Sequence, residues 1–158
     1  MLTDSIRQQI TEFLAERHPE VFIIDMQMHV GSRTSLSLRI DNDRGIKLEE
    51  IGKLTKDLGP WLDDSEFFEF DHGLEVSSPG ATEPLKIKRQ YLKHIGRELF
   101  IHITDGQEMI GILEETSEDH IKIRPRLKKK VVKGRPIRYE EEAIELPFSN
   151  IERAIVNI

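Results

Sequence analysis

The hydrophobic pattern of this chain changes its period at Ser77-Ser78-Pro79-Gly80. Before this segment, stretches with apolar residues three to four positions apart alternate with stretches in which every second residue is apolar. After it, the two-residue period of β-strands dominates. A chain of 158 residues has room for one domain of ordinary size or for two small ones. The change of period favours two, which we place at residues 1–82 and 83–158.

The pattern of the first domain predicts a small α+β layer. Its first helix has candidate caps at Thr3 to Ser5 and ends at His18-Pro19, because proline disfavours helical geometry in the residue before it. Gly59-Pro60 should end or kink the second helix. The expected order is a helix up to residue 17, strands over 22–30 and 36–40 joined by a turn at 31–34, a helix from 48 to 58, and a strand at 74–77.

The second domain is predicted to be a small closed or nearly closed β-barrel. Pro79 and Gly80 suit a type II turn, in which glycine supplies the positive φ of the third position. A short helical piece around Tyr91 then ends at Gly96. Five short strands follow within about 60 residues and no long helix interrupts them, which is typical of a small barrel.

The composition excludes several classes of protein. Because the chain has no Cys, it has no disulfides, thiolate metal sites or cysteine nucleophiles, and a reducing cytoplasm is favoured. Its longest apolar run, Val21 to Ile24, is far shorter than the about 20 residues of a membrane span, and its start is not that of a secretory signal. Six scattered His and the lack of nucleophile-elbow and phosphate-loop motifs predict no catalytic residue, metal, cofactor or small-molecule substrate.

The net charge of −6 conceals a strong asymmetry. Residues 1–80 carry a balance of −8, whereas the segment from Lys122 to Arg138 contains nine Lys or Arg and no acidic residue. Such a strip on an otherwise acidic chain indicates a surface for a polyanion. The candidate binding residues are Arg126, Lys128, Lys129, Lys130, Lys133, Arg135 and Arg138.

Two interpretations of this basic strip remain open. A basic hairpin projecting from a barrel could follow the phosphates of a nucleic acid, with an affinity that falls steeply with salt. Alternatively, the strip is a solvated loop, with which Glu140-Glu141-Glu142 nearby could pair. Aromatic residues are not interleaved with the basic ones, so base stacking on single strands is poorly supported.

The segment Ser77, Ser78, Pro79 and Gly80 is the second candidate binding site. Its hydroxyls and backbone N–H groups could hold an anion, as backbone nests do. The simpler interpretation is a turn that joins two domains.

Several motifs along the chain resemble those of one bacterial family. Leu74-Glu75-Val76-Ser77-Ser78-Pro79-Gly80 followed by Pro84-Leu85 is similar to the signature of the ribosome maturation factor RimP family. Further similarities follow in the same order: Ile95-Gly96-Arg97-Glu98, the strand around Gly111, and Leu146 to Ala154. The resemblance covers nearly the whole chain, and these motifs are specific as a set.

The resemblance implies an N-terminal α/β domain of two helices on a three-stranded sheet and a C-terminal SH3-like or Sm-like β-barrel. It also implies a cytoplasmic, non-enzymatic factor, expected to be monomeric, that assists maturation of the small (30S) ribosomal subunit. Its expected partners are the immature subunit, through a ribosomal protein of the decoding region, and 16S rRNA. An alternative function is that of an Sm-like or KH-like RNA-binding regulator not tied to the ribosome.

The chain departs from the family pattern at two places. Ala81-Thr82-Glu83 stands where the family usually has Leu-Asp-Arg, and the carboxylate of Glu83 would repel phosphate. The long strip around residues 128–138 replaces what is commonly a short turn in the family barrel.

Overall fold

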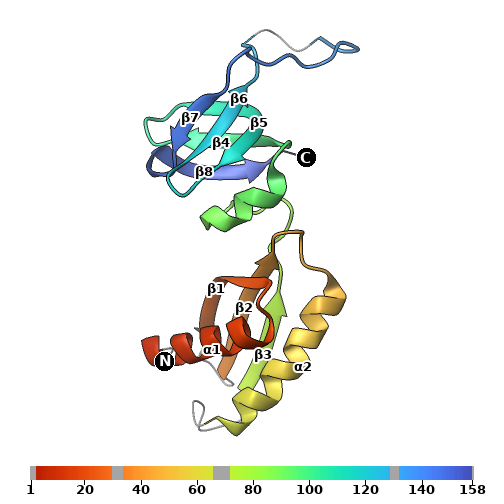
Figure 1. Ribbon diagram of the computed structural model, residues 1–158, viewed down its shortest axis with the longest axis vertical. Helices are drawn as coiled ribbons and strands as arrows, with labels where there is room; N and C mark the ends of the chain where they lie inside the picture. The colour runs from red at the N-terminus through yellow and green to blue at the C-terminus, as the bar shows by residue number, and fades with distance from the viewer. Residues whose placement is uncertain (1–2, 30–33, 66–71, 129–131, 158) are drawn as a thin grey trace. The chain divides into compact units, whose positions relative to one another are not determined.

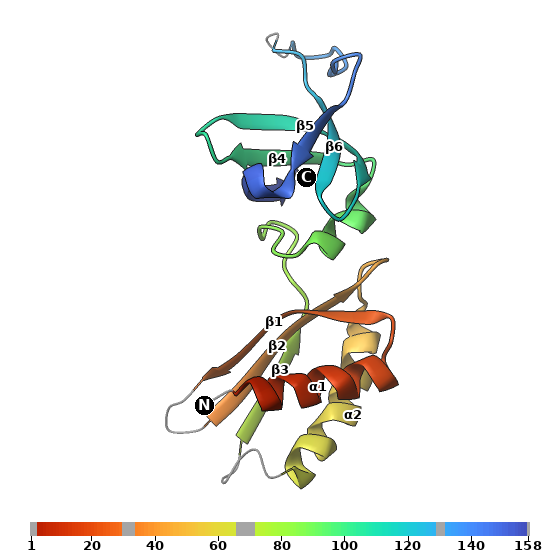
Figure 2. The same cartoon turned by 60° about the vertical axis from the view of Figure 1, so that its left-hand side comes forward.

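The structure is a computed structural model that describes residues 3–29, 34–65, 72–128 and 132–157. The chain forms two compact units, Met1–Pro79 and Gly80–Ile158, called here the first and the second unit. The first consists of two helices on a three-stranded sheet and the second is built on a five-stranded antiparallel sheet (Figures 1 and 2), which confirms the predicted α+β fold class. The units divide three residues before the predicted 82/83 boundary, which stays a prediction for independently folding domains.

The first unit follows the order helix, strand, strand, helix, strand. Its elements are α1 (Asp4–Arg17), β1 (Val21–His29), β2 (Thr34–Asn42), α2 (Leu48–Asp64) and β3 (His72–Ser77). The sheet order is β1-β2-β3, with β1 antiparallel and β3 parallel to β2. A parallel pair needs a long crossover, and α2 provides it. Most of the turn predicted at 31–34 lies outside the described residues.

Both helices of the first unit pack on the same face of the sheet. Leu36, Leu38 and Ile40 alternate along β2 and are completely buried, as the two-residue period predicts. They share one core with the buried residues of both helices, which are Ile10 and Leu14 of α1 and Leu54, Leu58 and Leu62 of α2. The Thr3 hydroxyl accepts a hydrogen bond from the Ile6 N–H at 3.3 Å, so the predicted cap of α1 is confirmed.

Of the two outcomes predicted at Gly59-Pro60, a helix end or a kink, the helix end is wrong, because α2 continues to Asp64. Proline in a helix interior costs about 3 kcal/mol through its missing donor and its clash with the preceding turn. Burial of Leu62 and the stacking of Trp61 on Phe13, with ring centroids 4.6 Å apart, offset this cost. Pro60 itself is exposed, so water can hydrate the carbonyl that its ring leaves unbonded.

The second unit begins with the short 3₁₀ helix η1 (Lys88–His94) and continues as strands. These are β4 (Glu98–Ile103), β5 (Glu108–Thr116), β6 (His120–Pro125), β7 (Ile144–Pro147) and β8 (Ile151–Val156), with the 3₁₀ turn η2 (Phe148–Asn150) before β8. Strand order is β7-β6-β5-β4-β8 and all pairs are antiparallel. Gly96, predicted to follow the short helix, has φ +90°, which is favourable only for glycine.

The connection between β7 and β8 requires this sheet to curl. The two strands lie at opposite ends of the sheet order, which in a flat sheet would place them about 19 Å apart. The four peptide steps from Pro147 to Ile151 span at most about 14 Å. The sheet must therefore bend around its buried side chains, among them Leu99, Ile101 and Ile121. This topology makes the second unit a small β-barrel, as predicted.

Gly111 allows β5 and β6 to approach each other closely. It lies opposite Pro125, and a Cβ atom at this position would be 2.6 Å from the carbonyl oxygen of Arg124 and 2.8 Å from Cγ1 of Ile123. Real Cβ atoms essentially never come so near to backbone oxygen. The curvature of the barrel at this point therefore depends on glycine.

Candidate nucleic-acid interface

The basic strip divides into a strand part and a loop part. Lys122 and Arg124 lie in β6, and the remaining basic residues lie in the eighteen-residue connection from β6 to β7. At the start of this connection, Arg126 forms an isolated antiparallel bridge with Tyr139. Residues 127–138 between these two positions are called the basic loop below. A connection of this length, whose described residues belong to no helix or strand, is typical of a functional segment.

Carboxylates of neighbouring strands pair with the two cations of β6. Nζ of Lys122 lies 3.3 Å from a carboxylate oxygen of Glu115. Nε of Arg124 donates to Glu114 at 2.7 Å, and its Nη1 donates to a backbone carbonyl shortly before β7 at 2.9 Å. These two side chains lie on the surface of the barrel, but because carboxylates pair with them they add little net positive charge to it.

Arg126 is engaged in a more enclosed polar cluster. Its Nε and Nη2 donate to the two carboxylate oxygens of Glu98 at 2.6 and 2.5 Å. The same carboxylate accepts from the hydroxyl of Tyr139 at 2.7 Å and from the amide of Asn157 at 2.6 Å. The hydrogen bond from Arg126 is the main cause that lowers the pKa of Glu98, and the same bond raises the pKa of Arg126. Burial, followed by the bond to Glu98, raises the pKa of Tyr139.

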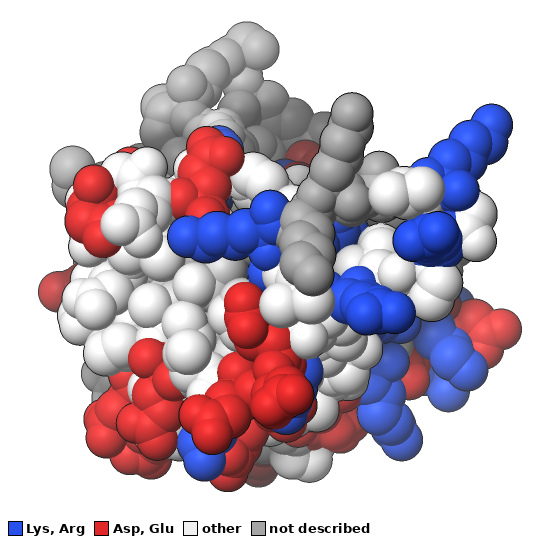
Figure 3. Space-filling model, turned by 90° about the horizontal axis from the view of Figure 1, so that it is seen from above, with Lys and Arg blue, Asp and Glu red and all other residues white. Residues whose placement is uncertain are grey.

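The cations of the basic loop are placed differently. Lys128, Lys133, Arg135 and Arg138 are exposed, and within the described part of the chain their side chains form no ion pair or hydrogen bond. Lys129 and Lys130 lie outside the described residues. In Figure 3, which views the molecule from the side where this loop lies, Lys and Arg side chains gather on one side and Asp and Glu side chains on another.

A tight turn lies within the basic loop, at residues 132–135. The N–H of Arg135 donates to the carbonyl of Val132 at 3.1 Å, and Gly134 has φ +86° at the third position, as a type II turn requires. Val132 and Ile137 on either side of the turn are exposed apolar residues. The described part of the loop therefore presents positive charge and a little apolar surface. Among its described residues, the strand pairing of the expected basic hairpin is confined to the base, at Arg126 and Tyr139.

The acidic residues after the loop line a hollow of their own. Glu140, Glu141 and Glu142 border an open hollow of about 840 Å³ together with Leu127, Arg138, Tyr139 and Ile144. Among the described residues, their carboxylates form no ion pair with the loop cations. Pairing of the strip with these glutamates is therefore absent among the described residues, and both interpretations of the strip, a nucleic-acid contact and a solvated loop, stay predictions.

The segment Ser77 to Gly80 crosses from the first unit into the second. Ser77 is the last residue of β3 and pairs with Arg39 of β2, Ser78 and Gly80 are exposed, and Pro79 is half-buried. The predicted type II turn centred on Pro79 and Gly80 is wrong, since Gly80 does not have a positive φ. The turn lies two residues later, at 80–83, where the Glu83 N–H donates to the Gly80 carbonyl at 3.1 Å.

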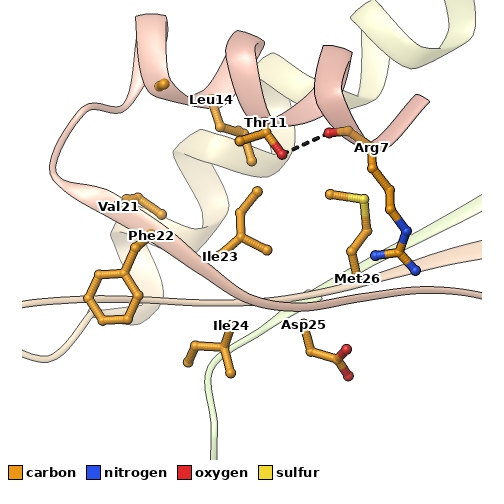
Figure 4. Close-up of a pocket in the computed structure, with 10 residues that line it drawn as sticks. Arg7, Thr11, Leu14, Val21, Phe22, Ile23, Ile24, Asp25 and Met26 are labelled. Atoms are coloured by element: carbon orange, nitrogen blue, oxygen red, sulfur yellow. Dashed lines mark hydrogen bonds between the residues drawn. The ribbon is translucent and has the colours of Figure 1, made fainter. Parts of the chain in front are cut away.

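A second hollow, of about 510 Å³, lies between α1 and β1 (Figure 4). Its lining is mainly apolar, with Arg7 and Asp25 as the charged residues. Ile23 and Met26 point toward α1, whereas Ile24 and Asp25 both point to the other side, as the β-bulge between Ile23 and Asp25 requires. The Thr11 hydroxyl in this lining donates to the Arg7 carbonyl at 2.7 Å.

No group of three His, Asp or Glu side chains in the described part of the chain is placed to hold a metal ion. No helix in the described ranges is both long and apolar enough to cross a membrane.

Sequence reasoning missed the cluster around Glu98. Its members are 28, 41 and 59 positions from Glu98 along the chain, at Arg126, Tyr139 and Asn157. A period or a local motif cannot connect residues this far apart, because strand register alone brings them together. The only sequence signal was a glutamate at the start of a predicted strand.

The fold and the candidate site define a class: a two-unit α+β protein whose small β-barrel presents a basic loop. The family model described as the RimP N-terminal domain matches residues 9–82. Over 153 residues the chain is 31% identical to the ribosome maturation factor RimP of Cytophaga hutchinsonii, covering 94% of this chain and 91% of that protein. It is 32% identical to the RimP of Flavobacterium psychrophilum over 157 residues, covering 98% and 96%. The chain belongs to the ribosome maturation factor RimP family, as its sequence motifs predicted.

Proposed function

We propose that this protein assists maturation of the small (30S) ribosomal subunit by binding the immature particle, without catalysis and without a cofactor. The observation that carries the proposal is similarity over nearly the whole chain to proteins named ribosome maturation factors. Both units are included in that similarity, so the barrel belongs to the same functional context as the first unit. We further propose that it acts in the cytoplasm as a monomer.

We propose that the basic loop contacts phosphates of 16S rRNA. Its six cations are Lys128, Lys129, Lys130, Lys133, Arg135 and Arg138. Exposed cations without internal partners can replace the counterions of a nucleic acid, and their release favours binding. Arg126, although part of the same basic strip, has its guanidinium occupied by Glu98 and contributes to this surface indirectly.

The remaining partner is assigned by charge. Residues 1–80 carry a balance of −8, which suits a basic ribosomal protein. We propose that a ribosomal protein of the decoding region is a partner, and that Ser77 to Gly80 are part of the surface that binds the particle. The Glu83 side chain packs near Gly80, with Cγ 3.6 Å from the position of a Cβ there, so this segment favours contact with protein over contact with phosphate.

The test is sedimentation of cell lysate through sucrose gradients at low and high salt. We expect the protein to migrate with small-subunit precursors at low salt and to dissociate at high salt. Replacing Lys128, Lys129 and Lys130 by Glu should weaken the association and reduce the slope of log affinity against log salt by about 2 to 3, with little change in thermal stability.

The matched control reverses three exposed cations of the first unit, Arg44, Lys53 and Lys56, which changes the net charge equally. Equal loss of binding in the control would show that total charge, and not the loop, determines the association. Migration wholly in the free fraction at low salt would refute the proposed function. Binding to RNA without migration with ribosomal precursors would instead favour the Sm-like or KH-like regulator.

A further inference from the structure

The base of the basic loop is closed by backbone hydrogen bonds. The N–H of Leu127 donates to the carbonyl of Arg138 at 3.0 Å, next to the bridge between Arg126 and Tyr139. Beyond this pair the described residues of the loop belong to no strand. The direction in which the loop leaves the barrel is therefore set at Arg126 and Tyr139.

The side chains of both bridge residues end on the same carboxylate. Glu98, the first residue of β4, receives two hydrogen bonds from Arg126 and one each from Tyr139 and Asn157. Asn157 follows β8, and its backbone N–H also donates to the Glu98 carbonyl at 2.9 Å. One carboxylate thus joins both sides of the loop base to the first strand of the barrel and to the residue after its last strand.

The carboxylate and the guanidinium of the cluster are largely shielded from solvent, so water competes little for their hydrogen bonds. The side chain of Glu98 is 13% exposed and that of Arg126 is 24% exposed. A bidentate guanidinium–carboxylate pair restricts orientation more than a single hydrogen bond does. Removing the carboxylate would leave a half-buried guanidinium without its partner, which would favour a rearrangement of the loop base toward water.

We propose that Glu98 is a positioning residue for the basic loop: its carboxylate fixes Arg126 and Tyr139 so that the described loop cations, Lys128, Lys133, Arg135 and Arg138, form a preorganised array for RNA phosphates. The inference depends on the proposed RNA contact and names a residue that controls it. A preorganised array binds more tightly because less conformational freedom is lost on binding. Glu98 is thus an acidic residue that promotes the binding of a polyanion.

The sign of the effect makes this inference testable. Glu98→Gln raises the net charge by one, so a purely electrostatic role predicts tighter binding to RNA. The positioning role predicts the opposite, a loss of about fivefold to tenfold in affinity. The measurement is a binding titration of the full chain with a fluorescent transcript of 16S rRNA at two salt concentrations. Tyr139→Phe, which leaves the charge unchanged, should give a smaller loss in the same direction.

Glu114→Gln is the matched control. It raises the charge equally and removes the partner of Arg124, which keeps its backbone acceptor before β7. We expect binding as tight as the wild type or slightly tighter. If Glu98→Gln and Tyr139→Phe both bind as tightly as wild type or as Glu114→Gln, the positioning role is refuted while the proposed function stands.

A second measurement does not depend on the ligand. Because the chain has no native Cys, spin labels can be attached specifically at Ile137→Cys in the loop and Glu152→Cys in β8. We expect a narrow distribution of label distances in the wild-type background and a broad one with Glu98→Gln. Equal distance distributions would refute the positioning role of Glu98 even if RNA binding changes. A wild-type protein that does not bind the transcript would independently refute the proposed RNA contact.

Discussion

Replacing Gly111 with Ala tests the close approach of β5 and β6 on which the barrel depends. The new methyl group would be 2.6 Å from the carbonyl oxygen of Arg124, whereas an ordinary carbon–oxygen contact is about 3.3 Å or longer. The strands must separate by roughly 0.7 Å to accept it. The obstructing oxygen belongs to the backbone, so no side-chain rotation can relieve the contact.

The expected cost lies at the upper end of the range for overpacking. An extra methyl group in a packed core costs about 1 to 3 kcal/mol, and a backbone obstruction favours the higher value. The reduced entropy of the unfolded chain returns about 0.4 to 1 kcal/mol when Ala replaces Gly. We therefore expect the free energy of unfolding of the second unit to fall by about 2 kcal/mol, and that of the first unit to remain unchanged.

Urea denaturation can follow the two units separately. The single Trp, Trp61, lies in the first unit, and both Tyr residues, Tyr91 and Tyr139, lie in the second. Gly111→Ala should move the tyrosine transition to lower urea without moving the tryptophan transition. Gly52→Ala is the control: it lies inside α2 with open space around its Cβ position, so it should stabilise the first unit by about 0.5 to 1 kcal/mol. An unchanged tyrosine transition in the Gly111 variant would refute the packing argument.

Three further predictions concern stability. Pro60→Ala should raise the free energy of unfolding of the first unit by about 1 to 2 kcal/mol, because it restores a helix hydrogen bond; a lower tryptophan midpoint in urea would contradict this. Asp41→Ala should lower the free energy of unfolding of the first unit by about 2 kcal/mol, because the buried carboxylate accepts hydrogen bonds from the N–H groups of Asn42 at 2.9 Å and Ile46 at 3.0 Å. An unchanged tryptophan midpoint in urea would show that these bonds are dispensable. Folding lowers the pKa of Glu98, so its carboxylate stabilises the folded state fully at pH values above the unfolded pKa of about 4.3. This stabilisation is lost as pH falls through the folded pKa. In parallel urea titrations, the wild type should therefore lose stability in acid more steeply than Glu98→Gln.

Most secondary structure was predictable because its signals are local. Alternation of Leu36, Leu38 and Ile40 predicted a strand with one buried face, and Thr3 predicted a helix start. The prediction failed at Pro60, where the propensity of one residue opposed tertiary packing and packing prevailed. It failed also at Gly80, since the sequence allowed turns in neighbouring positions and only the backbone distinguishes them.

The sequence predicted that the candidate interface is rich in Lys and Arg, but not which of these side chains are paired with carboxylates. Nine cations in one segment were evident from the sequence alone. The structure divides them, because Lys122, Arg124 and Arg126 have carboxylate partners, whereas the described cations of the loop have none among the described residues. The partners of the first three lie on other strands, so their pairing depends on register.

The sequence by itself determined the division into two units, the strand and helix periods, the family and the position of the positive charge. These properties follow from side-chain chemistry over a few residues, or from motifs that need no long-range contact. Tertiary structure decided which cations are neutralised, that β5 requires glycine at Gly111, and that one carboxylate at Glu98 holds the base of the basic loop. Each of these depends on groups 7 or more positions apart being brought together by strand pairing, which a linear pattern does not encode.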